Sequence, residues 1–347
     1  MELMVKIRKR LRNFELAADF MVRDEVFALL GASGCGKSMT LKCIAGIEQP
    51  DSGRIVLDGR VLYDSEAGIN LRPQQRRVGY LFQNYALFPN MTIGENIRFA
   101  ASGSREQREQ KVQENLRRFS LAELAGAYPH ELSGGQQQRA AFARILSSDA
   151  GLLLLDEPFS ALDSYLRWQL ELELSEVLQA YDGMALLVSH DRGEVYRLAD
   201  RVAVIDRGKM ETAYTKHALF QHPDTLAATL LTGCKNVSLV QRVDQHRVIA
   251  DDWQLELMTE QIVPDKVRYA GIRAHYIEVK AAAGVNTFCM EVVKVIEDTF
   301  SYLIMIRRQG TRAKPIRWEL DKSAWHSIVA AQLYLYFPPD KIMLMEH

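Results

Sequence analysis

The residues best suited to chemistry lie between positions 31 and 38, where the chain reads GASGCGKS. This segment fits the spacing G-x-x-x-x-G-K-[ST], follows an apolar run at 26–30 and precedes a helical pattern at 39–45. Glycines allow such a loop to curl until successive N–H groups face one point, and the next helix directs its positive dipole end there. The sequence therefore predicts a strand, a phosphate-binding loop and a helix.

Two side chains of this loop would supply a charge and a metal ligand. Lys37 would neutralise the outer phosphates, and Ser38 would offer a hydroxyl to Mg²⁺. We also expect some thiolate at Cys35, because the loop backbone is open and Lys37 is close. The other residues expected to contact phosphates are Gly31, Ala32, Ser33, Gly34, Gly36 and Met39.

Two carboxylates end an apolar run, LLLLDE, at 152–157. A continuous apolar run of this length is typical of a central parallel strand that is covered on both faces. Asp156 would then lie at the carboxyl end of the strand, near Mg²⁺. Glu157 would lie one residue further, where it could orient or deprotonate a water.

Two more polar residues follow predicted strands. Gln83 comes after the strand at 78–82, and His190 comes after the strand at 185–189. Polar residues at the carboxyl ends of sheet strands are placed to face a nucleotide. We therefore group both residues with the loop.

A second helix start that favours anions lies at 132–139, LSGGQQQR. Ser133 is a good N-cap, and Gly134 and Gly135 leave the first N–H groups of the helix open. The helical pattern continues to about Leu146.

The N-terminal part has the pattern of antiparallel strands. Residues 1–25 alternate polar and apolar side chains, and we expect these strands to flank the strand at 26–30. The basic residues of the first segment are interpreted as the solvated face of an edge strand. Arg76 and Arg77 are likewise expected to be solvated.

In the rest of the chain, the composition and the predicted secondary structure change twice. Residues 84–130 are interpreted as a helical insertion, with helices at 106–119 and 121–127. Short β-rich segments separated by turns fill residues 236–347 and predict a small all-β, barrel-like domain. The predicted domains are therefore 1–232 and 236–347.

The composition fits a folded protein with more than one core. The chain has 347 residues, of which 48% are hydrophobic and 25% charged, and its net charge of -1 gives no basic field for nucleic acid. The four cysteines lack C-x-x-C spacing, which favours reduced thiols over a zinc site or a disulfide framework. No apolar run is long enough to span a membrane.

Taken together, these residues resemble the nucleotide-binding subunit of ABC transporters. Six motifs stand in family order: Walker A at 31–38, the Q-loop at Gln83, the signature at 132–136, Walker B at 152–157, the D-loop at 160–163 and the switch His190. The resemblance implies an α/β P-loop NTPase fold, with a RecA-like parallel sheet, an antiparallel β subdomain and a helical subdomain at 84–130. It also implies ATP and Mg²⁺ as cofactors.

The resemblance assigns a role to each residue. Lys37 neutralises the β- and γ-phosphates, Ser38 and Gln83 ligate Mg²⁺, and Asp156 holds the water shell of the metal. Glu157 polarises the attacking water, and His190 steadies the γ-phosphate. The signature residues Ser133, Gly134, Gly135 and Gln136 cover the ATP of a second copy in a head-to-tail dimer.

The same resemblance implies partners and a location. The region 84–99 would contact the integral-membrane permease subunits, so the protein would lie on the cytoplasmic face of the membrane as a peripheral subunit. Phe14 is the best candidate for stacking on adenine, although a core position in an alternating strand is an equally good interpretation.

Residues 236–347 resemble the regulatory TOBE/MOP-type domain of import ATPases. The stretches 58–70 and 231–238 are similar to those of molybdate- and sulfate-type ATPases, so we expect oxyanion import. Lys235, Asn236 and Ser238 could contact an oxyanion or could simply begin a strand. Alternatives are an importer of a sugar, polyamine or iron, and a soluble ABC ATPase with no role in transport.

Overall fold

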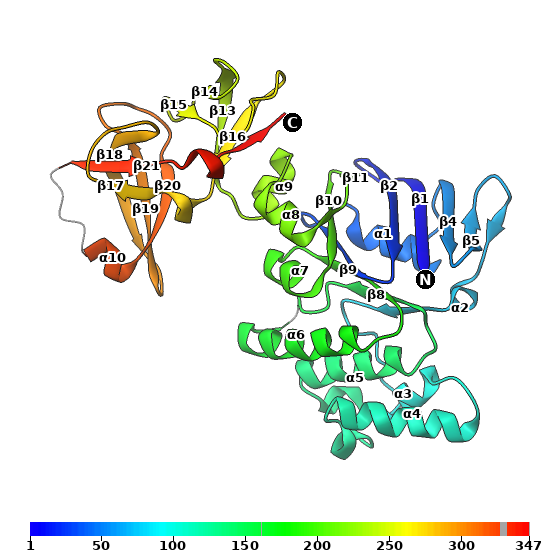
Figure 1. Ribbon diagram of the computed structural model, residues 1–347. Helices are drawn as coiled ribbons and strands as arrows, with labels where there is room; N and C mark the ends of the chain where they lie inside the picture. Colours follow the sequence, from blue (N-terminus) through cyan, green and yellow to red (C-terminus); the bar gives the residue numbers. More distant parts are fainter. Residues whose placement is uncertain (161, 327–331, 347) are drawn as a thin grey trace. The chain divides into compact units, whose positions relative to one another are not determined.

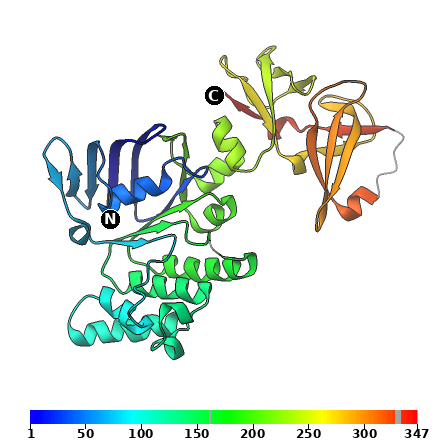
Figure 2. The ribbon, with the colours of Figure 1, turned by 180° about the vertical axis from the view of Figure 1, so that it is seen from behind.

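The computed structural model describes residues 1–160, 162–326 and 332–346, and Figures 1 and 2 show it from two opposite sides. The chain forms two compact units, Met1–Lys216 and His217–His347. This division falls before the boundary predicted after residue 232. The helices α8 (Lys216–Gln221) and α9 (Leu226–Leu231), predicted as one helical segment broken at Pro223, therefore fall almost wholly in the second unit.

A twelve-stranded mixed sheet forms the centre of the first unit. Its order is β6-β5-β4-β1-β2-β11-β10-β3-β9-β8-β7, with β12 paired to β10. The strands are β1 Glu2–Arg10, β2 Glu15–Arg23, β3 Val26–Leu30, β4 Ser52–Leu57, β5 Arg60–Asp64, β6 Ile69–Asn70, β7 Val78–Leu81, β8 Leu152–Asp156, β9 Met184–Ser189, β10 Arg201–Asp206, β11 Lys209–Met210 and β12 Tyr214–Thr215.

The strands that position the candidate residues are parallel neighbours. β7 pairs with β8, β8 with β9, β9 with β3 and β3 with β10, each in parallel. Every residue of β8 is buried, as its apolar sequence predicts for a covered strand. Because all these strands run the same way, the residues that follow β3, β7, β8 and β9 lie at one edge of the sheet.

The N-terminal strands are antiparallel, as the alternating pattern predicts, but their neighbours were predicted wrongly. β1 is hydrogen-bonded to β2 on one side and β4 on the other, so it is not an edge strand. β10 and β11 lie between β2 and β3, so the first two strands do not flank the strand that leads into the loop. Alternation reveals that a strand is half-buried, whereas its neighbours depend on strands far away in sequence.

Helices cover this sheet and form the insertion, and α3, α4 and α5 gather away from β1, β4 and β5 in both views (Figures 1 and 2). The predicted helix at 121–127 is wrong, because only Ala122–Leu124 forms a short 3-10 turn. The α3 helix was not predicted. The helices of the first unit are α1 Lys37–Ala45, α2 Pro73–Arg76, α3 Ile93–Ala100, α4 Arg105–Arg118, α5 Gly134–Leu146, α6 Ser164–Gln179 and α7 Arg192–Leu198, with a second 3-10 turn at Pro129–Glu131.

Two five-stranded antiparallel sheets build most of the second unit, in the orders β15-β14-β13-β16-β22 and β17-β21-β18-β19-β20. One hydrophobic cluster contains residues of both sheets, including the buried Trp318 and Phe337. The strands are β13 Asn236–Arg242, β14 Arg247–Ala250, β15 Leu255–Met258, β16 Tyr269–Ile272, β17 Glu278–Lys280, β18 Thr287–Glu297, β19 Ser301–Arg308, β20 Ile316–Asp321, β21 Leu333–Tyr336 and β22 Met343–Met345.

Three short helical segments complete the second unit: α10 Lys322–His326 and the 3-10 turns Ala274–Tyr276 and Pro339–Lys341. Among the described residues of the whole chain, no helix combines the length and the apolar character needed to cross a membrane.

Candidate active site

The glycine-rich loop connects β3 to α1 with an open backbone. Gly36 is the N-cap of α1 with φ of 115°, and no side chain caps the first N–H groups of the helix. A side chain at Gly36 would be strained at this φ, and its Cβ would lie 2.9 Å from Leu16 Cδ1. Ala32, Ser33 and Gly34 are exposed in the loop. The loop therefore offers uncapped backbone donors at a helix N-terminus, which suits an anion.

Lys37 is buried at the base of this loop, with only 4% of its surface exposed. Its Nζ donates to the carbonyl oxygens of Gly31 at 2.8 Å and Ala32 at 2.9 Å. The same nitrogen lies 3.9 Å from Glu157 Oε1. The ammonium is thus held between loop carbonyls and the first residue after β8, where an incoming phosphate oxygen would compete for it.

Ser38 and Asp156 come together from α1 and β8. Ser38 Oγ donates to Asp156 Oδ1 at 2.6 Å, and Tyr80 Oη donates to Asp156 Oδ2 at 2.8 Å. A hydroxyl and a carboxylate are hard oxygen ligands of the kind that Mg²⁺ prefers, so this pair fits that ion. Gln83, the third predicted ligand, is exposed and donates to Ser160 Oγ at 3.4 Å instead.

Tyr80 belongs to this cluster and was missed by the sequence analysis. Burial, followed by the Asp156 carboxylate, raises the pKa of Tyr80, so its hydroxyl remains a donor at physiological pH. The signal was present in β7, because the position of Tyr80 in a short strand beside β8 places it on the face opposite to its neighbours Gly79 and Leu81.

Glu157 and His190 meet at the ends of β8 and β9. His190 Nδ1 lies 3.3 Å from Glu157 Oε2, while the other oxygen of Glu157 faces Lys37. Glu157 has a left-handed φ of 46°, and its backbone N–H donates to the Val188 carbonyl at 3.0 Å. A non-glycine residue in this conformation is held by its surroundings, which is common at functional sites.

The signature segment begins its helix with a side-chain cap, unlike the glycine-rich loop. Ser133 Oγ accepts from the Gln136 N–H at 3.4 Å, and Gln136 Oε1 accepts from the Ser133 N–H at 2.9 Å, which together form a capping box at the start of α5. Gly135 is buried, and a Cβ there would lie 2.6 Å from Leu166 Cδ2 on α6. Within the described part of the chain, no hydrogen bond or ion pair joins Ser133–Gln136 to the glycine-rich loop.

A buried arginine links the signature helix to the segment after Gln83. Arg144 of α5 donates to the carbonyl oxygens of Ala86 at 2.6 Å and Tyr85 at 2.8 Å, and its guanidinium lies 5.7 Å from the centre of the Phe88 ring. Tyr85 and Ala86 both have left-handed φ angles, 61° and 46°. Arg144 thereby stabilises a segment with left-handed backbone angles. In the sequence, only its place within the apolar pattern of α5 indicated such a role.

Two further expectations about single residues were wrong. Arg76 is fully buried, not solvated, because it donates to the carbonyl oxygens of Cys43 and Ile44 at the end of α1, both at 2.8 Å. Cys35 is also buried, and this burial raises the pKa of its thiol despite the opposing effect of Lys37, so the expected thiolate is not favoured.

Other residues predicted for the site pack against neighbouring residues of the first unit or cap a helix. Met39 packs against the core of the first unit, and the ring of Phe14 lies beside Gly36 and Gly208. Of the D-loop, Asp163 caps α6 by accepting from Tyr165 and Leu166 N–H groups, while Ala161 lies outside the described residues.

The C-terminal candidates are engaged within their own unit. The Asn236 side chain exchanges two hydrogen bonds of 2.7 Å with the Arg317 backbone, which connects β13 to β20. Ser238 Oγ donates to the Leu239 carbonyl and accepts from the Asp252 N–H, and Lys235 Nζ donates to the Leu230 carbonyl. These contacts stabilise the unit and do not by themselves mark an oxyanion site.

Comparison with known proteins agrees with the geometry of the first unit. The family profile described as ABC transporter matches residues 19–160. A sulfate/thiosulfate import ATP-binding protein from Mannheimia succiniciproducens is 32% identical over 337 residues, which cover 93% of this chain and 92% of that protein. This chain belongs to the ABC ATPase family of import ATP-binding proteins. Its first unit is an ABC ATPase, with ATP and Mg²⁺ as cofactors.

Other relatives match a shorter part of the chain, and the matched part spans less than two thirds of their own length. A Fe(3+) ions import ATP-binding protein from Haemophilus influenzae is 40% identical over 214 residues, covering 61% of this chain and 60% of its own length. The putrescine transport ATP-binding protein of Escherichia coli is 41% identical and covers 62% of this chain and 56% of its own length.

A solved structure supports the same fold. A dimeric ATP-binding cassette in a post-hydrolysis state, bound to ADP and Pi, aligns with a TM-score of 0.52 and 25% identity. The alignment covers 62% of this ABC ATPase chain and 99% of that cassette.

Proposed function

We propose that this protein hydrolyses ATP as the motor subunit of an ABC importer, in a head-to-tail dimer. The observation that carries the proposal is the meeting of Lys37, the Ser38–Asp156 pair and the Glu157–His190 pair at the carboxyl ends of parallel strands. Among the described residues, no hydrogen bond or ion pair joins the signature segment to this cluster, which supports a dimer in which a second copy brings its signature to the site.

The proposed roles follow from the charges and distances. Lys37 would leave the Gly31 and Ala32 carbonyls to contact the β- and γ-phosphates, which would free one oxygen of Glu157. That carboxylate could then accept a proton from the attacking water, while His190 holds its other oxygen in place.

The metal ligands on this chain would be oxygen atoms. Ser38 would bind the ion directly, and Asp156 would hold its water shell, with Tyr80 fixing the carboxylate from the other side. Gln83 would have to exchange its contact with Ser160 for one with the metal. When bound, Mg²⁺ would neutralise charge that develops on the phosphates.

A second copy would complete the nucleotide site. In the proposed dimer, Ser133, Gly134, Gly135 and Gln136 at the start of α5 would bind the γ-phosphate of the partner's ATP through backbone N–H groups. The similarity to a dimeric cassette bound to ADP and Pi supports this arrangement.

The region 84–99 would receive the membrane subunits of the importer. Phe88 and Phe99 are exposed to 36% and 66%, and their rings meet edge to face at 4.9 Å. Beside them lies a surface pocket of about 370 Å³ lined by Asn90, Met91, Glu95, Arg98 and Phe99. An apolar permease segment that inserts there would keep the protein on the cytoplasmic face of the membrane.

The proposed solute is an oxyanion of the sulfate or molybdate type. The sulfate/thiosulfate relative aligns with 93% of the chain, including the second unit, whereas the iron and putrescine relatives align with 61% and 62%. Iron and polyamine import are the alternatives, since those relatives are 40% and 41% identical over their shorter alignments, against 32% for the sulfate/thiosulfate relative. Calorimetric titration of the full chain with molybdate, tungstate and sulfate tests for a regulatory oxyanion site, and an absence of heat with all three would remove that idea.

Hydrolysis and dimerisation test the central proposal. We expect the purified protein to release phosphate from MgATP, and the Glu157→Gln variant to lose about 10²- to 10⁴-fold in kcat while forming an ATP-dependent dimer. Light scattering measures the dimer, and Glu66→Gln, an exposed carboxylate elsewhere in the first unit, is the matched control. Hydrolysis without any nucleotide-dependent dimer, even beside a permease, would instead favour a soluble ATPase outside transport.

A further inference from the structure

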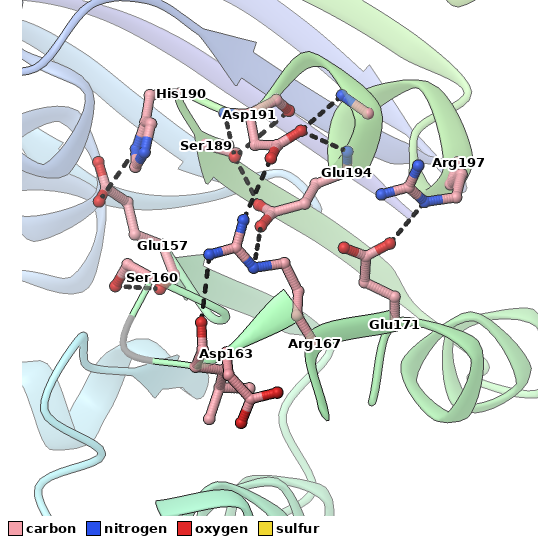
Figure 3. A network of polar contacts seen from close by, with 12 residues as sticks. Glu157, Ser160, Asp163, Arg167, Glu171, Ser189, His190, Asp191, Glu194 and Arg197 are labelled. Atoms are coloured by element: carbon pink, nitrogen blue, oxygen red, sulfur yellow. Dashed lines mark hydrogen bonds and ion pairs between the residues drawn. The ribbon is translucent and has the colours of Figure 1, made fainter. Parts of the chain in front are cut away.

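A polar network joins α6 and α7 to the ends of β8 and β9, and it lies beside the Glu157–His190 pair (Figure 3). The proposed mechanism does not use this network. Its centre is Arg167, which extends from α6 toward the segment that carries His190.

Arg167 contacts two segments that are distant in sequence. Its Nη2 donates to the Leu162 carbonyl at 3.4 Å, just before α6 begins. Its Nη1 donates to Asp191 Oδ2 at 3.3 Å, and its Nε lies 3.9 Å from Glu194 Oε1. The planar guanidinium therefore bridges the segment after β8 and the segment after β9 with different nitrogen atoms.

The contacts of Arg167 close a ring through the catalytic pair. On one side, Ser160 N and Oγ both donate to the Glu157 carbonyl, and the Leu162 N–H donates to the Phe159 carbonyl at 3.3 Å. On the other side, His190 lies between Ser189 and Asp191. The ring closes where His190 Nδ1 meets Glu157 Oε2 at 3.3 Å.

The segment around His190 is itself held tightly. Ser189 Oγ donates to the buried Glu194 Oε2 at 2.6 Å and accepts from the Asp191 N–H at 2.9 Å. Asp191 Oδ1 also caps α7 by accepting from the N–H groups of Gly193 and Glu194. A movement of Arg167 would therefore be transmitted to the backbone on both sides of His190.

We propose that Arg167 is a positioning residue that keeps Leu162 and the Ser189–Asp191 segment in register, so that His190 remains beside Glu157. This inference rests on the proposed ATPase function. It assigns to Arg167 an effect on the hydrolytic step without contact with ATP, because its three nitrogen atoms face Leu162, Asp191 and Glu194.

The chain offers a matched control in the same pair of helices. Arg197 of α7 donates to Glu171 Oε2 of α6 at 2.5 Å, and the Glu171 side chain is only 2% exposed. This pair also joins α6 to α7, but in the part of the chain that the structure describes it has no hydrogen bond or ion pair to Leu162 or to Ser189–Asp191. Removing it leaves a buried carboxylate unpaired, so it should destabilise the protein at least as much as a change at Arg167.

Steady-state kinetics of Arg167→Gln, Arg167→Lys and Arg197→Gln separate the two roles. We expect Arg167→Gln to lower kcat about 10- to 100-fold and to leave KM for ATP within about threefold, because misplacement of reacting groups affects turnover more than binding. Arg197→Gln should keep kcat within about twofold. Arg167→Lys keeps a charge beside Glu194 but has no fork to reach both Leu162 and Asp191, so its thermal stability should recover while kcat stays low.

Amide hydrogen exchange provides a second readout that needs no activity. Loss of Arg167 should raise exchange at Leu162 and Asp191 together, whereas Arg197→Gln should not. Equal kcat losses for Arg167→Gln and Arg197→Gln, full rescue by lysine, or unchanged exchange at both amides would overturn the inference. If the wild-type protein hydrolyses no ATP, the proposed function fails, and the exchange experiment still decides whether Arg167 couples the two segments.

Discussion

The N-termini of α1 and α5 use their backbone N–H groups in different ways. α1 begins at Gly36 without a side-chain cap, and residues of other elements, Asp156 and Glu157, converge on Lys37 and Ser38 beside it. α5 begins at Ser133 with a complete capping box to Gln136. A helix start thus becomes a nearly complete site only where distant strands deliver further groups, whereas the capped start of α5 mainly stabilises its own helix.

This difference fits the proposed function, in which the α1 start would bind phosphates and the α5 start would act on a second copy. At the α5 start Gly134 is exposed and Gly135 is buried, and within the described ranges no cation or carboxylate from a strand makes a hydrogen bond or ion pair with Ser133–Gln136. The following variants, in order of decreasing effect, test this contrast.

The largest effect is expected at the α1 start. Lys37→Met removes the ammonium that faces Gly31, Ala32 and Glu157, and a charge-assisted bond to phosphate is worth about 1.5–3 kcal/mol. The Kd for MgATP should therefore rise about 10- to 100-fold, as measured by fluorescent nucleotide titration. Lys42→Met, in the last turn of the same helix, should bind ATP like the wild type; equal losses in both variants would refute the contrast.

At the start of a third helix, α7, we expect an effect of intermediate size, which is a dependence of the free energy of unfolding on pH. Burial raises the pKa of Glu194 to about 6 from the model-compound value of 4.5, with Ser189, Asp191, Glu171 and Arg167 around it. The folded state therefore favours the protonated form of Glu194. The contribution of this protonated side chain to the stability of the fold is fully present below pH 4.5 and is lost as the pH rises through about 6.

The glutamine side chain of the Glu194→Gln variant cannot ionise, so this variant should not lose stability in this way as the pH rises. Its free energy of unfolding should rise relative to the wild type by about 2 kcal/mol between pH 4.5 and 7, which corresponds to the shift of the pKa. Urea unfolding at several pH values measures the difference. Glu176→Gln, an exposed glutamate of α6, should show no such trend; a flat difference for Glu194→Gln as well would remove the assigned penalty of burial.

The smallest effect is expected at the α5 start, where a matched helix is available. Ser104 caps α4 with Gln107 in the same capping-box geometry as Ser133 and Gln136. Ser133→Ala and Ser104→Ala should each cost about 1 kcal/mol of stability. In a Glu157→Gln background, only Ser133→Ala should weaken the ATP-dependent dimer, by about tenfold. Equal dimerisation of both variants in sedimentation experiments would show that Ser133 serves only its own helix.

Much of the site could be predicted because its groups occupy the ends of regular elements. Asp156, Glu157 and His190 directly follow buried strands, and parallel strands bring their carboxyl ends to one edge. The helix start at Ser133 and the β-rich character of residues 236–347 were also predictable from local patterns, whereas the division of these strands into two five-stranded sheets was not predicted. Predictions about single polar residues were less successful, since the solvated Arg76 and the ionised Cys35 were both wrong.

The sequence by itself determined the glycine-rich loop, the strand ends and the helix caps, because each depends on residues that are neighbours in the chain. Only the tertiary structure decided the roles of three arginines, the buried Arg76 and Arg144 and the half-buried Arg167. Arg76 reaches carbonyls 33 and 32 positions earlier in the chain, and Arg144 reaches carbonyls 58 and 59 positions earlier. Arg167 finds Asp191 at 24 positions' distance. Such partners are set by packing between elements, which local composition and periodicity do not encode.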